Sequence, residues 1–246
     1  VGSVGWALPY TQVEILRLNE DGSLGEPCAT DEIGVITIQG DHISPGYLDP
    51  EHNDGVFDTG RLNSGDLGYK DAQGRIYIAG RSKDLIIRSG HNIDPAMIEN
   101  AMATHPAVAL AAAVGMPDAY AGELPVCFVE LLPGADVSME DLHQHAQSVI
   151  DERPAWPKLI HAIDTIPLTT VGKIFKPSLR CIVAKQKVMD LVQNEFGIAN
   201  ARVEVVTGGA RGMRVTVTLS EGDRSSVTEL ETVLAAFLFE AQVQVG

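Results

Sequence analysis

The first third of the chain alternates apolar and polar side chains over short runs. Residues 12–18 and 34–39 repeat with a period of two, which predicts strands that bury one face. The runs 67–70 and 75–79 have the same character, and the turn sequence Asp-Ala-Gln-Gly at 71–74 separates them. We therefore expect an antiparallel hairpin across this turn.

The middle of the chain alternates helical and strand patterns. Asp94 is a good helix N-cap with proline at the next position, so we expect a helix over residues 95–104. The continuously apolar runs 108–114 and 126–132 are typical of strands that are buried on both faces. The other elements expected here are a helix of about fourteen residues opened by a capping box at Ser138, and a strand at 159–163.

The last sixty residues have a pattern of their own. A helix is expected over 186–196, a β-hairpin over 202–206 and 213–219, an amphipathic helix over 226–240 and a last strand at 241–245. This order, α-β-β-α-β, predicts a small two-layer unit. The glycine-rich stretch 208–212 lies between strands and opens no helix, so it is interpreted as a turn rather than a phosphate loop.

Composition narrows the class of protein. The chain has 246 residues, 45% of them apolar, and a net charge of −15, which disfavours nucleic acid or an anionic membrane surface as the main partner. No apolar run reaches membrane length. Cys28, Cys127 and Cys181 are odd in number, far apart and without metal-ligand spacing, which indicates reduced thiols, a cytoplasmic protein and no metal site.

A carboxylate and a guanidinium are expected to meet at the open end of the predicted hairpin. With the turn centred between residues 72 and 73, Asp66 falls opposite Ala79, and Arg81 lies about 5–8 Å away at the same end. A carboxylate can accept hydrogen bonds from a ribose diol, and a guanidinium can bind a phosphate bidentately. The alternative interpretation is a surface ion pair that only closes the hairpin.

Four motifs in sequence order resolve this choice. GDLGY, GRSKDLI, SGHNIDP and PLTTVGKI, which begin at Gly65, Gly80, Ser89 and Pro167, resemble the core motifs of the adenylate-forming acyl-activating enzymes, a family that includes acyl-CoA synthetases and AMP-dependent ligases. The resemblance covers residues 1–180 and only the carboxy-terminal portion of the family, so we expect the chain to be a fragment.

The resemblance implies roles for five residues. Lys173 is the catalytic lysine of the last motif, Asp66 binds the ribose hydroxyls, and Arg81 binds the ribose and phosphate region. Lys83 is the hinge of a mobile lid, and Gly90 lies in the loop that admits the thiol of CoA. ATP, Mg²⁺ and CoA are the implied co-substrates.

The resemblance also implies a fold and a division into domains. The fold class is α+β: a small antiparallel β-barrel segment at 1–82 ends the amino-terminal domain, a compact α+β lid occupies 83–182, and the extra two-layer unit occupies 183–246. The implied function is that of an acid–CoA ligase of the fatty or aromatic acyl-CoA synthetase type, with a small carboxylic acid and CoA as partners. An enzyme that loads an acyl carrier protein and a non-catalytic interaction module are the alternatives, and the chain could form a homo-oligomer.

Overall fold

The computed structural model describes residues 2–19, 23–58, 60–208 and 212–246. The chain forms two compact units, Val1–Leu85 and Ile86–Gly246. Its fold is mixed α/β, with one antiparallel sheet in the first unit and two mixed sheets in the second. No helix among the described residues has the length and apolar content needed to cross a membrane.

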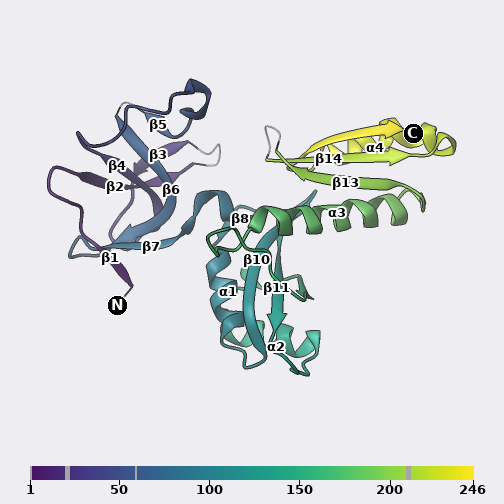
Figure 1. Ribbon diagram of the computed structural model, residues 1–246, viewed down its shortest axis with the longest axis horizontal. Helices are drawn as coiled ribbons and strands as arrows, with labels where there is room; N and C mark the ends of the chain where they lie inside the picture. The colour runs from purple at the N-terminus through teal and green to yellow at the C-terminus, as the bar shows by residue number, and fades with distance from the viewer. Residues whose placement is uncertain (1, 20–22, 59, 209–211) are drawn as a thin grey trace. The chain divides into compact units, whose positions relative to one another are not determined.

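The first unit is a sheet of seven strands in the order β1-β7-β6-β4-β2-β3, with β5 paired to β6 (Figure 1). Its strands are β1 (Ser3–Gly5), β2 (Gln12–Leu18), β3 (Leu24–Pro27), β4 (Gly34–Gln39), β5 (Phe57–Asp58), β6 (Arg61–Lys70) and β7 (Ile76–Arg81). The strand order ends at β1 and β3 among the described residues, so the sheet is not a closed barrel, and the β-barrel segment that we expected is not confirmed. Both edge strands are short, and β3 ends at Pro27, which has no N–H to donate to a further strand.

The predicted hairpin is β6–β7, but its register differs from the expected one. Asp66 lies opposite Arg81 rather than Ala79. Two features cause the shift: Asp71 pairs with Arg75 around a longer turn, and a bulge at Ala79 falls between the pairs of Leu67 with Gly80 and of Gly68 with Ile78.

The second unit begins with a sheet in the order β10-β11-β8-β9, and β12 pairs parallel to β11. Its strands are β8 (Ile86–Arg88), β9 (His91–Ile93), β10 (Val108–Asp118), β11 (Gly122–Leu131) and β12 (Leu159–Ala162). Two helices, α1 (Pro95–Ala103) and α2 (Met139–Val149), begin at the predicted caps Asp94 and Ser138.

Both faces of this sheet are buried, as the continuously apolar runs predicted. Ala111, Ala113 and Cys127 pack with α1 and α2, and the alternate residues Ala112 and Phe128 pack with the helix α3 (Lys176–Asn194). The period-two alternation of β10 and β11 thus supplies two separate cores from the same two strands.

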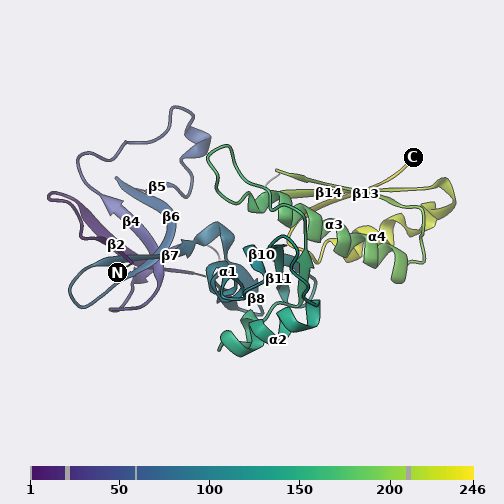
Figure 2. The same ribbon diagram turned by 60° about the horizontal axis from the view of Figure 1, so that its bottom comes forward.

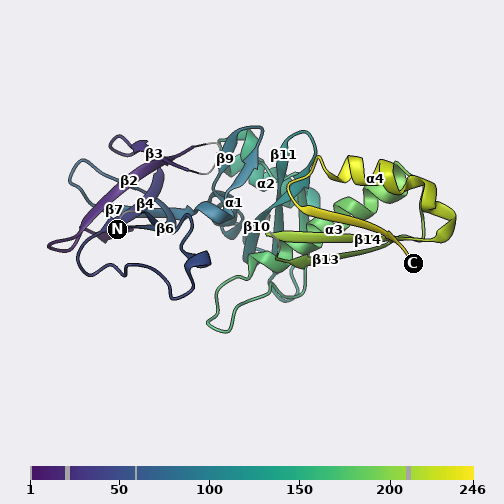
Figure 3. The same cartoon turned by 90° about the horizontal axis from the view of Figure 1, so that it is seen from above.

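Helix α3 continues from the sheet β10-β11-β8-β9 into the last part of the chain (Figures 1 and 3). Leu179 and Val183 belong to a core with β10 and β11, whereas Val188, Leu191 and Val192 belong to a core with the sheet β13-β14-β15. That sheet comprises β13 (Arg202–Thr207), β14 (Met213–Leu219) and β15 (Glu240–Val245).

Helix α4 (Val227–Leu234) is shorter than predicted and lies with α3 on one side of this small sheet (Figure 2). The expected division between residues 182 and 183 falls inside α3. The glycine-rich stretch 208–212 that we interpreted as a turn lies largely outside the described residues.

Candidate functional site

Asp66 and Arg81 form an ion pair at the end of the β6–β7 hairpin. Nε of Arg81 lies 2.8 Å from Oδ1 of Asp66, and the side chains are 64% and 31% exposed, respectively. Local hydrogen bonds fix the strand end, because the Oγ of Ser64 accepts from the Asp66 amide and donates to the carbonyl of Ile36 in β4. The partly exposed carboxylate beside an exposed guanidinium is a pair that ligand hydroxyls and a phosphate can reach.

Lys173 lies on a loop that is closed by its own backbone. The amide of Thr169 donates to the carbonyl of Lys173 at 2.6 Å, and the amide of Gly172 donates back to the carbonyl of Thr169 at 2.9 Å. Gly172 has a φ of +79°, a left-handed conformation that favours glycine. The side chain of Lys173 is exposed and has no ion pair within the described part of the chain. Its ammonium group is therefore presented to solvent from a well-defined turn.

Buried side chains hold the base of this loop, and sequence reasoning missed them. Lys176 forms an ion pair with Glu99 of α1 at 2.8 Å, and both side chains are less than 20% exposed. Just before the loop, the amide of Ile166 donates to the carboxylate of Glu130 in β11 at 3.0 Å. The available signal for Glu99 was its helical spacing with the apolar positions Pro95 and Met102 on one face of α1.

Gly90 lies in a tight turn between β8 and β9. Ser89 and Gly90 have φ values of +49° and +82°, and Arg88 pairs with His91 across this two-residue turn. A Cβ built on Gly90 meets nothing within 4 Å. The amide of Ser89 donates to the carbonyl of Ala121 at 2.7 Å, which ties the turn to the β10–β11 connection.

A buried carboxylate that sequence reasoning also missed supports the same hairpin. Oε2 of Glu123 accepts the amide of Ile87 in β8 at 3.0 Å, and its carboxyl group packs over Gly115, where a Cβ would come within 2.4 Å of it. Burial raises the pKa of Glu123, while the Ile87 amide and Arg180 oppose that rise.

The Gly90 turn and the Lys173 loop are attached near opposite ends of β11. The turn is held at Ala121 and Gly122, whereas the Lys173 loop is held at Glu130. The eight residue steps from Gly122 to Glu130 span roughly 26 Å at the usual rise of a strand. The second unit thus holds the two candidate loops at separate places along β11.

Lys83 lies in the short 3-10 helix Ser82–Asp84, two residues before the boundary between the two units. Its side chain is exposed. Asp66, Arg81 and Lys83 belong to the first unit, and Gly90 and Lys173 belong to the second. Of the five predicted residues, Asp66 and Arg81 are the pair that the structure brings into contact.

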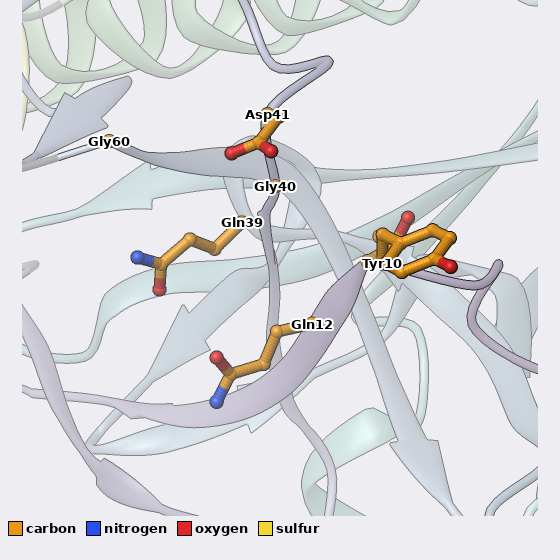
Figure 4. Close-up of a pocket in the computed structure, with 7 residues that line it drawn as sticks. Tyr10, Gln12, Gln39, Gly40, Asp41 and Gly60 are labelled. Atoms are coloured by element: carbon orange, nitrogen blue, oxygen red, sulfur yellow. The ribbon is translucent and has the colours of Figure 1, made fainter.

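The first unit also contains an open pocket of about 590 Å³ between the ends of β2 and β4. Gln12 and Gln39 are cross-strand neighbours, and Figure 4 shows their side chains beside each other, with Tyr10 and Asp41 at the rim. None of the five predicted site residues lines it. Among the described residues there is no group of three or more His, Cys, Asp or Glu side chains that could hold a metal ion.

Comparison with known proteins identifies the second unit. Residues 97–173 match the family of AMP-binding enzyme C-terminal domains. The chain is 41% identical over 218 residues to marinolic acid–CoA ligase from a Pseudoalteromonas species, a match that covers 88% of the chain and 33% of the relative. Since 218 of the 246 residues match, the likeness extends past Arg180, and our expectation that it stops there is wrong for this relative.

Solved structures give the same result. ATP-bound MatB from Rhodopseudomonas palustris superposes with a TM-score of 0.68 at 29% identity, over 75% of this chain and 36% of that one. O-succinylbenzoate coenzyme A synthetase from Bacillus subtilis, in complex with ATP and magnesium ion, gives a TM-score of 0.61 at 31% identity over 73% and 36%.

The chain spans about a third of the length of the relatives described above. Its matched domain and the solved structures agree with the four sequence motifs. The chain therefore belongs to the adenylate-forming acyl-activating enzymes and carries their carboxy-terminal portion.

Proposed function

We propose that this chain is the carboxy-terminal part of an ATP-dependent acid–CoA ligase, which forms an acyl adenylate and then an acyl thioester. The observation that carries the proposal is Lys173, an exposed lysine on a backbone-closed loop at the end of the matched family domain. The relative with 41% identity is named as an acid–CoA ligase.

Lys173 is the proposed catalytic residue of adenylation. When a carboxylate attacks the α-phosphate of ATP, negative charge grows on phosphate oxygens, and a fixed cation lowers the barrier. An exposed ammonium group with no ion pair in the described part of the chain is available for that role. Mg²⁺ would neutralise further phosphate charge, but the described residues of this chain offer no group of ligands for it.

Asp66 and Arg81 are the proposed ribose and phosphate contacts. The carboxylate of Asp66 forms an ion pair with Arg81 and is still 31% exposed, so it can accept hydrogen bonds from a diol. The more exposed guanidinium of Arg81 can donate to a ribose oxygen or a phosphate. Their ion pair orients each group before a nucleotide arrives.

Residues 83–182 are the proposed lid, with Lys83 as its hinge and Gly90 in the loop that admits the thiol of CoA. Lys83 lies next to the boundary between the two compact units, which is where a hinge must be. The space around Gly90 is open, so a pantetheine arm can approach the backbone closely. We assign residues 1–82 to the end of the amino-terminal domain and residues 183–246 to an added unit that shares α3 with the lid.

The test uses a ligase that carries this chain as its carboxy-terminal part. We expect pyrophosphate release that depends on ATP and one acid of a panel, followed by a thioester with CoA. The chain alone should release none, because groups for the triphosphate and acyl chain are expected outside it. A thioester formed only on a carrier protein would identify the alternative acceptor, and no pyrophosphate with any acid would contradict the proposal.

The three free cysteines are consistent with a cytoplasmic enzyme.

A further inference from the structure

The ion pair between Glu99 and Lys176 lies directly behind the Lys173 loop. Nζ of Lys176 is 2.8 Å from Oε1 of Glu99, and the exposed fractions of the two side chains are 14% and 19%. The same oxygen of Glu99 accepts the amide of Ala113 in β10 at 2.9 Å. One carboxylate therefore joins three elements, α1, β10 and the first turn of α3.

The Lys173 loop, residues 167–175, is coupled in position to Lys176. Lys176 is the first residue of α3, three residues after Lys173. The loop is closed on itself, because the amide of Phe175 donates to the carbonyl of Pro167 and Leu168 bridges Ile174. A closed loop moves as a block with the helix that follows it, so the pair that fixes the first turn of α3 also fixes where Lys173 stands.

We propose that Glu99 and Lys176 are positioning residues for Lys173 in the adenylation step. This inference rests on the proposed function of Lys173. A side-chain pair can hold the loop tightly because both partners are largely buried, where an ion pair is screened less than at the surface. Neither residue is assigned to touch substrate; they act through the loop.

The closing experiment compares variants of the ligase in the two half-reactions. Lys176→Met keeps the length of the stem and removes the charge, and Glu99→Gln keeps an acceptor for the Ala113 amide but loses the ion pair. Each should lower single-turnover adenylation by about tenfold, since small misplacements of a catalytic group are costly. Thioester formation from pre-made acyl adenylate should be unchanged, and Lys176→Arg should restore adenylation.

Helix α3 provides a matched control. Lys187 pairs with Asp118 of β10 at 3.6 Å, so this ion pair also anchors α3, but eleven residues further along the helix from Lys176. Lys187→Met should leave both half-reactions unchanged. Loss of both half-reactions in Lys176→Met would show a general structural role and overturn the inference.

Hydrogen exchange on the chain itself gives a second readout that needs no activity. The amides of Thr169 and Gly172 are hydrogen-bonded within the loop, and they should exchange faster in Lys176→Met but not in Lys187→Met. Lys173→Ala is assayed alongside. If Lys173→Ala leaves adenylation intact, the proposed function fails; if it abolishes adenylation while Lys176→Met changes neither rate nor exchange, only the positioning inference fails.

Discussion

The two candidate loops of the second unit each contain an exposed glycine with positive φ, and they differ in how they are held. Gly172 and Gly90 have nearly the same φ, +79° and +82°, and both loops are exposed. The Gly90 turn belongs to a β-hairpin that pairs with the sheet, and the Ser89 amide bonds to a backbone carbonyl. The Lys173 loop depends on the side chains of Glu130, Glu99 and Lys176.

This difference has a consequence for catalysis. Backbone pairing places the Gly90 turn, and the carboxylate of Glu123 adds one side-chain contact to the Ile87 amide of its hairpin. The position of the Lys173 loop is set by a few charged side chains, so single substitutions can shift it without unfolding the sheet. We therefore expect the first half-reaction to be more sensitive to substitutions behind its loop than the second.

The largest effect is expected for Lys173→Ala in the ligase. Removing one preorganised charge from a phosphoryl transition state typically costs 10²–10³-fold in rate. Adenylation should fall by about that factor, while thioester formation from pre-made acyl adenylate should survive, because a different loop serves that step. Single-turnover assays of each half-reaction measure both, and equal defects in the two steps would contradict the two-loop mechanism.

Gly90→Leu should give the opposite pattern with a smaller effect. The new side chain fills open space at the proposed thiol entrance, and displacing a reactant by about 1 Å can cost on the order of 10²-fold. Pyrophosphate release should be retained.

Gly134→Leu is the matched control for this variant. Gly134 has a φ of +78° and also has nothing within 4 Å of a built Cβ, so it carries the same backbone strain of about 1–2 kcal/mol. Because Gly134 lies outside the thiol loop, the thioester step should be spared. A loss of that step in both variants would mean that strain alone, and not a blocked entrance, explains Gly90→Leu.

The elements of the fold could largely be predicted from the sequence. The alternation in β2 and β4, the two-sided burial of β10 and β11 and the caps at Asp94 and Ser138 are local signals, and each appears where it was expected. The β-barrel segment was not confirmed, because the closure of a sheet depends on whether its edge strands meet, which no local pattern shows. The register at Asp66 also failed, since a bulge at Ala79 leaves no local signature.

In the candidate site, too, the local contact was predicted and the contacts between distant parts of the chain were missed. Asp66 and Arg81 were expected within reach of each other, and they form an ion pair. Glu99 and Glu123 were missed because their partners, Lys176 and the amide of Ile87, lie far away in sequence and only the tertiary fold brings them close. The functional roles of all five residues, Asp66, Arg81, Lys83, Gly90 and Lys173, stay predictions.

Removing the last unit should affect solubility more than adenylation. A cut after Asn194 keeps α3 whole but uncovers Val188, Leu191 and Val192, and each buried side chain of this kind is worth about 1.5–3 kcal/mol. We expect aggregation of the truncated ligase, with the adenylation rate of the soluble fraction within a few-fold.

Two further variants separate a loss of solubility from a loss of adenylation. Adding Val188→Thr and Leu191→Gln to the protein truncated after Asn194 should restore solubility without changing the adenylation rate. Cutting instead before Lys185 removes the second half of α3 and should destabilise the lid further. A collapse of adenylation in the soluble, folded Asn194 truncation would show that the last unit takes part in the chemistry.

The smallest effect is expected for Glu123→Gln, which tests whether backbone pairing really holds the Gly90 hairpin. Glutamine keeps an acceptor for the Ile87 amide, so the amides of β8 should stay protected from hydrogen exchange and thioester formation should be unchanged. The variant should, however, alter how stability depends on pH. Burial raises the pKa of Glu123 above its ordinary value of 4.5.

The raised pKa of Glu123 in the folded protein sets how the stability changes with pH. The folded protein holds the Glu123 proton to a higher pH than the unfolded chain does, so folding takes up a proton between 4.5 and the raised value. The stability of the parent protein relative to Glu123→Gln should therefore be greatest below pH 4.5, fall as the pH rises through this window and then level off. Urea unfolding of both proteins across this range measures the difference. A difference that grows with pH would mean that attraction to Arg180 outweighs burial, and faster exchange throughout β8 would mean that the carboxylate, rather than strand pairing, holds the hairpin.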